Sequence, residues 1–191
     1  RGALSFARWL HARLQGRIKR DGAGAMSGQV GLRMSDGALL TPFLYLEPGR
    51  KPVMLQTGFT LDAAARRLKL PDFSYRHPGV LELEGKVELD LDLEQPQLRS
   101  LQLESGQTQA ATLYQSCFQP LLSGTLLESV RFDGGFRFKA EQGRGGPLRL
   151  DLDLRRLSLE DAPDPDLYPD QQPRFALRGL NGRLQWSDGS T

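Results

Sequence analysis

The sequence is poor in cysteine and has no long apolar run. Cys117 is the single cysteine among 191 residues, which excludes an internal disulfide framework and a cysteine-rich metal site. No apolar stretch approaches the roughly 20 residues of a membrane-spanning helix, and the charged beginning lacks the apolar core of a signal peptide. Because the chain starts at Arg1 rather than Met, we expect a segment of a longer protein.

Acidic residues are missing from the beginning of the chain. The first 20 residues carry no Asp or Glu but six basic side chains, namely Arg1, Arg8, Arg13, Arg17, Lys19 and Arg20. The other 171 residues hold 19 of the 25 basic residues and all 23 acidic ones, a net charge of −4. A mildly acidic body lacks the basic stripe of a nucleic-acid-binding domain, so we expect no nucleic-acid partner.

Catalytic and metal-binding motifs are also lacking. The two histidines, His11 and His77, have no partner motif, and no Ser or Cys stands in a nucleophile context. Asp-x-Asp pairs at 90–92 and 151–153 lie in alternating sequence, which places them on a solvated strand face. The aspartates of a Pro/Asp loop at 161–173 lack the glycine and final Glu of a calcium-binding loop. We therefore expect no enzyme, no cofactor and no metal site.

The first segment has a helical pattern. Apolar residues recur at steps of three and four over residues 3–19, at Leu4, Ala7, Leu10, Leu14 and Ile18. We expect a basic N-terminal helical arm at 1–26, distinct from a β segment at 27–191. Such a helix can lie on an anionic membrane surface or pack on a neighbouring part of the protein. The candidates for membrane contact are Phe6, Arg8, Trp9, Arg13 and Arg17.

From Ser27 onward the apolar period becomes two, which indicates β-strands separated by turns. One such turn is expected at 35–37 (Ser-Asp-Gly). The clearest strand is 80–94, in which acidic residues and one lysine alternate with Leu81, Leu83, Gly85, Val87, Leu89, Leu91 and Leu93. One face of this strand is dry and the other is wet.

A helical period interrupts the strands at about 108–123. Its apolar positions fit one helical face and are Ala110, Leu113, Tyr114, Cys117, Phe118, Leu121 and Leu122. Pro120 is expected to end or kink this helix. We expect it to pack on the sheet and to cover one end of the apolar face.

Alternation returns after residue 130 and continues to the last strand. At 155–156 (Arg-Arg) the apolar positions slip by one residue, which predicts a β-bulge. The predicted fold class is mainly β: a long, twisted, predominantly antiparallel sheet, either a curved groove or a half-barrel. It carries one inserted amphipathic helix and an N-terminal helix.

The apolar face of this sheet is the candidate site. It can be the core of a closed sandwich or half-barrel, or an open groove that holds acyl chains, and both alternatives require the same alternation. The groove candidates are Leu81, Leu83, Val87, Leu89, Leu91, Leu93, Phe132, Phe136, Phe138, Leu148, Leu150, Leu152, Leu154, Leu184 and Trp186.

Part of the sequence resembles a known family. The segments 120–125 (PLLSGT), 150–161 (LDLDLRRLSLED) and 175–186 (FALRGLNGRLQW) resemble the AsmA-like superfamily of bacterial envelope proteins, in particular YdbH- and TamB-type bridge-like lipid transfer proteins. The resemblance implies a parent protein anchored in the inner membrane. It also implies that the protein crosses the periplasm and moves phospholipid along a β groove in outer membrane biogenesis. The Pro/Asp loop at 161–173 is longer than the family pattern.

The sequence therefore predicts a binding protein. We expect a segment that carries phospholipid, or another acyl-chain lipid, between membranes, with flanking segments of the parent protein and other envelope proteins as further partners. The alternative is a β-rich scaffold or protein-interaction module of the cell envelope, with a closed core and no lipid.

Overall fold

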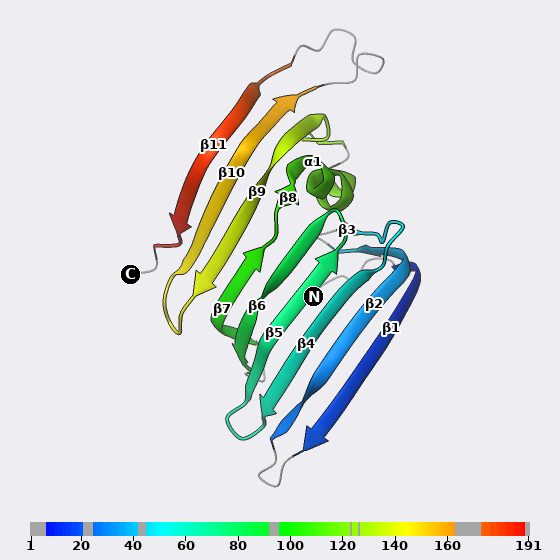
Figure 1. Cartoon of the computed structure of the whole chain (residues 1–191), viewed down its shortest axis with the longest axis vertical. Coiled ribbons are helices and arrows are strands. Elements are labelled where there is room, and N and C mark those ends of the chain that lie inside the picture. Colours follow the sequence, from blue (N-terminus) through cyan, green and yellow to red (C-terminus); the bar gives the residue numbers. More distant parts are fainter. Residues whose placement is uncertain are drawn as a thin grey trace.

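A computed structural model describes residues 7–20, 25–41, 45–91, 96–122, 124–125, 127–162 and 173–189, with side chains from His11 onward. Its strands form one antiparallel sheet that is not closed into a barrel. Nine strands follow one another across the sheet in the order β1-β2-β4-β5-β6-β7-β9-β10-β11, and two short strands, β3 and β8, pair with β2 and β9. Figure 1 shows β1 and β11 at opposite edges. The predicted mainly β, antiparallel fold is confirmed.

The strands are long for a chain of this size. The bounds along the sheet are β1 Ala7–Arg20, β2 Met26–Leu40, β3 Tyr45–Leu46, β4 Val53–Asp62, β5 Arg67–His77, β6 Leu81–Asp90, β7 Gln97–Ser105, β8 Thr108–Gln109, β9 Val130–Gln142, β10 Leu148–Asp161 and β11 Ala176–Ser187. At roughly 3.3 Å per residue, the 15 residues of β2 extend about 50 Å. Consecutive pairing of neighbours in the sequence makes the sheet a simple meander.

The N-terminal segment is a strand, so the predicted N-terminal helix is wrong over residues 7–20. β1 pairs with β2 along almost its whole length, from Ala7 opposite Leu39 to Arg20 opposite Met26. The hydrogen bonds that β2 offers along this edge outweigh a helical preference that rests on residue spacing alone. The predicted turn at 35–37 is also wrong, because β2 continues through it to Leu40.

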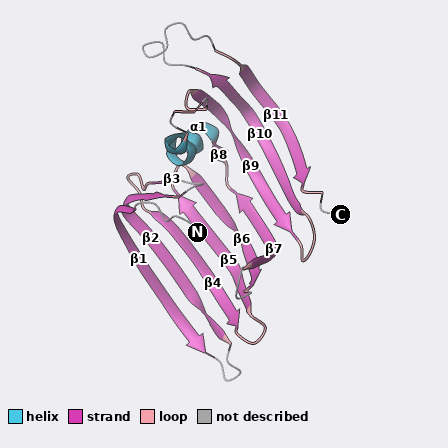
Figure 2. Cartoon of the chain, turned by 180° about the vertical axis from the view of Figure 1, so that it is seen from behind, coloured by secondary structure: helices cyan, strands magenta, loops and turns pink. Residues whose placement is uncertain are grey.

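The predicted helix at 108–123 is confirmed for its central part. After β8, the chain forms α1 (Ala110–Leu113), a π-helical turn (Tyr114–Phe118) and a 3₁₀ turn (Gln119–Leu121) without a break. We call residues 110–121 the helical segment. Figure 2 shows it at one end of the strands, close to β3, β8 and β9 and between the two edges of the sheet. In the described part of the chain, no helix has the length and apolar character needed to cross a bilayer.

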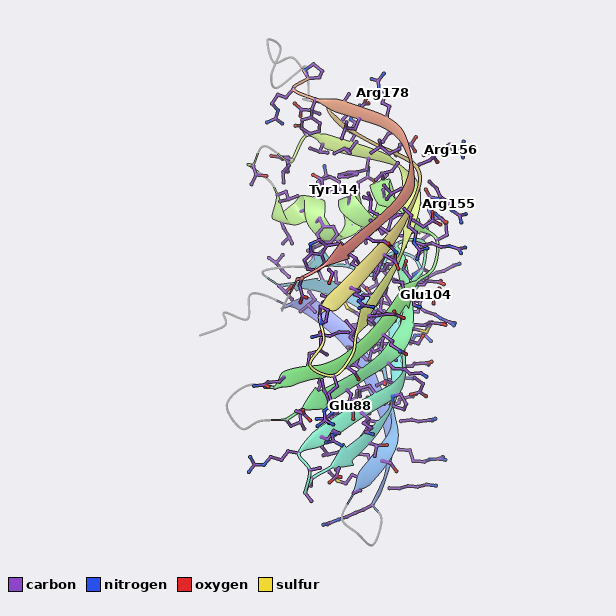
Figure 3. All side chains as sticks on the ribbon, turned by 90° about the vertical axis from the view of Figure 1, so that its left-hand side faces the viewer. Glu88, Glu104, Tyr114, Arg155, Arg156 and Arg178 are labelled. Carbon is purple, nitrogen blue, oxygen red and sulfur yellow. The ribbon has the colours of Figure 1, made fainter. Side chains whose placement is uncertain are left out.

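The sheet is bent, and the helical segment lies on its concave side (Figure 3). Part of the bend lies at the predicted bulge between β9 and β10, where the register shifts between Arg155 and Ser158. Arg156 has a positive φ of 47° there, and its carbonyl group faces Gly134, which has a φ of 78°. A Cβ on Gly134 would come within 2.1 Å of the Arg156 carbonyl oxygen, so the bulge requires glycine.

The convex face is polar. Figure 3 shows Glu104, Arg155 and Arg156 on this side, opposite to Tyr114. Ion pairs link neighbouring strands: the Arg99 guanidinium lies 2.7 Å from the Asp90 carboxylate, and Arg183 lies 2.9 Å from Asp151. These contacts hold the pKa of both aspartates below the usual value, chiefly through hydrogen bonds from the arginines. The first aspartate of each Asp-x-Asp pair is thus engaged in cross-strand pairing.

Candidate functional site

Strand pairing places apolar side chains from all nine main strands on the concave face, because directly opposite residues point to the same side of a sheet. One row of paired residues crosses the first half of the sheet and comprises Leu14, Leu32, Leu55, Tyr75 and Leu83. A second row crosses the other half and comprises Gly85, Leu103, Ala140, Leu150 and Trp186. Leu83 and Gly85 lie two residues apart in β6, so both rows share one face. The predicted common face of the 81–93 and 148–154 series is confirmed for the described residues.

The groove candidates lie on this face with two exceptions. β6 supplies Leu81, Leu83, Val87 and Leu89. β9 supplies the phenylalanines and β10 supplies the leucines between 148 and 154, in facing pairs such as Phe138 with Leu152, and β11 supplies Leu184 and Trp186. Leu91 follows directly after β6, and Leu93 lies outside the described residues. The structure therefore brings together residues that are more than 100 positions apart in the sequence.

Among the described residues, those that cover the concave face lie at one end of it. Met34, Leu46 and Val53 form a buried cluster where β3 folds onto β2 and β4. The helical segment adds the buried Tyr114 and Cys117, and the Tyr114 ring lies 4.7 Å from that of Phe132, centroid to centroid. Each of these contacts lies toward the same end of the strands. The covered end is a small core on the concave side of the sheet.

Away from this end the apolar face is open to solvent. The β6 leucines are half-buried although they lie in a central strand. On the edge strand β11, Leu184 is 60% exposed and Trp186 is 55% exposed. On the opposite edge, Leu14 is 72% exposed and Ile18 is 65% exposed. Exposed apolar side chains at both edges, with half-buried ones between them, make this face a candidate binding surface.

The total exposed surface leads to the same conclusion. The chain exposes 13752 Å² to solvent. A compact monomer of its mass, 21.3 kDa, would expose only about 9,100 Å². A single-layer sheet explains the excess, because each strand presents both of its faces.

In the described strands, one Asp and one His side chain are buried on the apolar face, both at the covered end. Asp161 ends β10, and its side chain is inaccessible to solvent. Its carboxylate accepts hydrogen bonds from Arg174 Nε at 2.6 Å and from Ser129 Oγ at 2.5 Å. These donors hold the pKa of Asp161 far below its usual value. The group connects the starts of β9 and β11 to the end of β10 and therefore has a structural role.

His77 is the second of these two side chains. It ends β5 opposite Leu81 and is almost inaccessible, and its Nδ1 atom has no hydrogen-bond partner among the described residues. Burial lowers the pKa of His77, and an interaction with the Glu47 backbone acts in the opposite direction. A neutral imidazole is the form that fits this apolar site. Among the described residues, no group of three or more His, Cys, Asp or Glu side chains is arranged to hold a metal ion.

The candidates for membrane contact have a different setting from the predicted one. Arg13 and Arg17 lie in β1 and point to the polar face, since they pair with Arg33 and Gln29 of β2. Arg8 and Trp9 belong to the same strand, and Phe6 lies outside the described residues. The helix on which that prediction rests is absent from the described part, but the basic residues remain together along one edge of the sheet.

Sequence reasoning misses several contributors to the apolar face. Leu14 and Ile18 fit the predicted helix, and Leu55, Tyr75 and Leu103 are not among the groove candidates. The sequence does contain a strand pattern for Leu14 and Ile18, because residues 12–19 alternate apolar or small side chains with Arg, Gln and Lys. The apolar period of two also continues around Leu55, Tyr75 and Leu103, as it does in β6.

Comparison of the chain with protein-family models, curated proteins and solved structures finds no match.

Proposed function

We propose that the concave apolar face binds the acyl chains of phospholipid, and that this chain is a lipid-carrying segment of a cell-envelope protein. The observation that supports the proposal is a continuous apolar face on a single-layer, open sheet. The resemblance to AsmA-like proteins supports the same proposal, since a bridge-like lipid transfer protein would use such a surface along its length.

The physical basis of binding is desolvation. Burying one CH₂ group of an acyl chain contributes about 0.8 kcal/mol, so a row of leucines can hold a chain without a specific hydrogen bond. Half-buried side chains such as Leu83 and Leu152 have apolar area left to bury against a ligand. A surface of this kind accepts many acyl chains and allows them to slide, which suits transport. None of its residues needs to do covalent chemistry.

The experiment compares Asp substitutions on the open part with one at the covered end. The purified chain is incubated with a photoactivatable phospholipid whose diazirine is in the acyl chain, and crosslinked lipid is measured by mass spectrometry. We expect Leu83→Asp, Leu89→Asp and Leu152→Asp to keep the fold and to lose most of the crosslink. A carboxylate at these positions stays hydrated and repels the acyl chain.

Leu154→Asp is the matched control. Leu154 lies on the same strand and the same face as Leu152, two residues away, but is buried. An unpaired charge there costs several kcal/mol, so this variant should unfold in thermal melts monitored by circular dichroism. Unfolding of the Leu152 variant as well, together with a wild type that never binds lipid, would refute the proposal. That result would support the alternative of a protein-interaction module whose apolar face is covered by another protein.

A further inference from the structure

A second surface lies along the edge strand β1, on the polar face of the sheet. Arg13, Arg17 and Lys19 of β1 point to this face, as does Arg33 of β2. All four side chains are exposed. We call these four residues the basic edge.

Two arginines of the basic edge face each other. Arg13 lies directly opposite Arg33 in the register of β1 and β2. Like charges directly opposite across two strands destabilise a sheet. Within the described part of the chain, neither of them forms an ion pair, so the repulsion is relieved by solvent or by a bound anion.

The other edge of the sheet is arranged differently. On β11, Arg178 lies 3.0 Å from Glu160, and Arg183 lies 2.9 Å from Asp151. The cations of β11 are thus neutralised by acids on the neighbouring strand β10. β2 places no acid directly opposite the basic edge, because Arg33, Gln29 and Ser27 lie opposite Arg13, Arg17 and Lys19. The acid of β2, Asp36, lies opposite His11 instead. The positive charges of the basic edge are therefore not neutralised by the neighbouring strand and face solvent.

A shallow polar hollow adjoins the basic edge on the same face. It has a volume of about 580 Å³ and is bordered by Arg17 and by the amide side chains of Gln15, Gln29 and Gln56. Gly31 and Gly58, which lie on this face, add no side chain to its base. Asp72 also borders it, and this carboxylate accepts a hydrogen bond from the Gly58 backbone N–H. A hollow with cationic and amide donors suits a polar headgroup that carries a phosphate.

The other side of β1 is apolar. Leu14 and Ile18 alternate with the cations, and both are among the most exposed apolar residues of the chain. An edge that has cations on one side and bare leucine and isoleucine on the other matches the boundary between headgroups and acyl chains. Nucleic acid would use the cations but would leave these apolar side chains in water.

We propose that the β1 edge docks on an anionic lipid membrane surface. The basic edge contacts phosphate-bearing headgroups, and Leu14 and Ile18 enter the boundary region beneath them. Residues beyond the first 20 carry a net charge of −4, so an anionic surface repels the rest of the molecule and favours this orientation. Docking at this edge is separate from acyl-chain binding on the concave face, and each can fail without the other.

Vesicle flotation tests the inference with the whole chain. We use vesicles of phosphatidylcholine alone and vesicles with one quarter phosphatidylglycerol. A Lys or Arg near an anionic surface contributes roughly fivefold in affinity. We therefore expect a variant with Arg13→Gln, Arg17→Gln, Lys19→Gln and Arg33→Gln to bind the anionic vesicles at least tenfold more weakly. Raising NaCl from 50 to 500 mM should release the wild type.

The matched control removes four charges elsewhere. Arg131→Gln, Arg137→Gln, Arg144→Gln and Arg149→Gln lie in and between β9 and β10, are exposed, and change the net charge equally. This variant should bind within about twofold of the wild type. An equal loss in both variants would show that net charge alone matters and would overturn the proposal. Equal binding to vesicles without phosphatidylglycerol would also overturn it.

Two further variants distinguish the remaining outcomes. Leu14→Ser with Ile18→Ser should weaken vesicle binding several-fold. The membrane proposal is wrong if this double variant binds vesicles as well as the wild type does and a single-stranded 20-nucleotide oligonucleotide competes fully with the vesicles. The basic edge would then be a general polyanion site. Leu152→Asp should float like the wild type, which separates docking from acyl-chain uptake. If the four-glutamine variant does not fold, Arg33→Gln alone, which removes the repulsion from Arg13, replaces it.

Discussion

At the level of single residues, the buried His and Asp side chains of the apolar face both lie at its covered end. His77 and Asp161 are buried there, whereas the open part of the face is lined by leucine, valine and phenylalanine. Asp161 has donors for both carboxylate oxygens, but in the described part of the chain His77 Nδ1 has no partner. Burying an imidazole in this way disfavours its charged form, so His77 makes stability depend on pH.

The His77 prediction concerns the range between pH 7 and pH 5. The folded-state pKa of His77 lies below 6.5, the ordinary value that applies to the unfolded chain. As the pH falls through 6.5, the unfolded chain takes up a proton before the folded one does, and stability decreases until the folded pKa is reached. Chemical denaturation at several pH values should show this decrease. His77→Asn should flatten the profile, and an unchanged slope would show that His77 is not its source.

A glycine in β6 gives a second prediction. A Cβ on Gly85 would lie 1.9 Å from the Gln102 carbonyl oxygen, a backbone atom that cannot move without shifting β7. We expect Gly85→Ala to lower the free energy of unfolding by about 1–3 kcal/mol, as overpacking typically does. Urea denaturation measures the change.

Gly143 provides the control for this substitution. A Cβ added there would have nothing within 4 Å, and the residue lies in the turn between β9 and β10. Gly143→Ala should be neutral, or stabilising by up to about 1 kcal/mol through the unfolded state. Equal effects of the two substitutions would contradict the close approach of β6 and β7.

At the level of elements, the helical segment is the only helix in the described part of the chain, and it covers the apolar face at one end. Its composite form, with α, π and 3₁₀ turns in succession, follows from Pro120 and from the need to direct Tyr114 and Cys117 to the same side. The Tyr114 hydroxyl donates a hydrogen bond to the Leu127 carbonyl, which ties the segment to the residues before β9.

Thiol reactivity reports on this element. Cys117 is 2% exposed, and burial raises the pKa of its thiol. We expect a thiol reagent at pH 8 to modify the native chain at least 100-fold more slowly than the urea-unfolded chain, because both access and thiolate formation are suppressed. Rapid modification of the native chain would mean that the helical segment is not packed on the sheet.

Sequence periodicity predicts most of the elements but not their assembly at the N-terminus. The strands around Leu83 and Leu150, the helical segment and the bulge at 155–156 all follow from local patterns. The helix prediction fails for β1 because Leu10, Leu14 and Ile18 are four residues apart, a spacing that falls on one face of a helix and also on one face of a strand. Pairing with β2 decides between them, and pairing is not visible in a short window.

The openness of the sheet cannot be predicted from the sequence at all. A closed sandwich and an open curved sheet need the same alternation, and Leu152 and Leu154 have similar local patterns. What separates them in the structure is position along β10: Leu154 lies opposite Phe136, which pairs with Thr108 of β8 just before the helical segment, and it is buried, whereas Leu152 is half-buried. This distinction depends on where distant elements fold back.

At the level of the whole molecule, the shape has a consequence for unpaired strand edges. Among the described strands, β1 and β11 each have a neighbour on one side, which leaves a row of backbone hydrogen-bonding groups on the other, and each carries exposed apolar residues. Free edges of this kind favour pairing with further strands. The charges along β1 limit such pairing between copies of this chain, since two basic edges repel each other.

The final prediction concerns the shape in dilute solution. A compact domain of 191 residues has a radius of gyration of about 16 Å. A bent single layer with strands of up to 15 residues is extended in two directions and should give a clearly larger value in small-angle X-ray scattering. Measurement over a dilution series separates shape from association through the edge strands. A value near 16 Å for the monomer would mean that the two halves of the sheet close over each other and bury Leu83 and Leu150 in a filled core. The proposed acyl-chain surface would then not exist in the free protein, and lipid binding would require the halves to open. A larger value, unchanged on dilution, would leave the concave face accessible to a ligand.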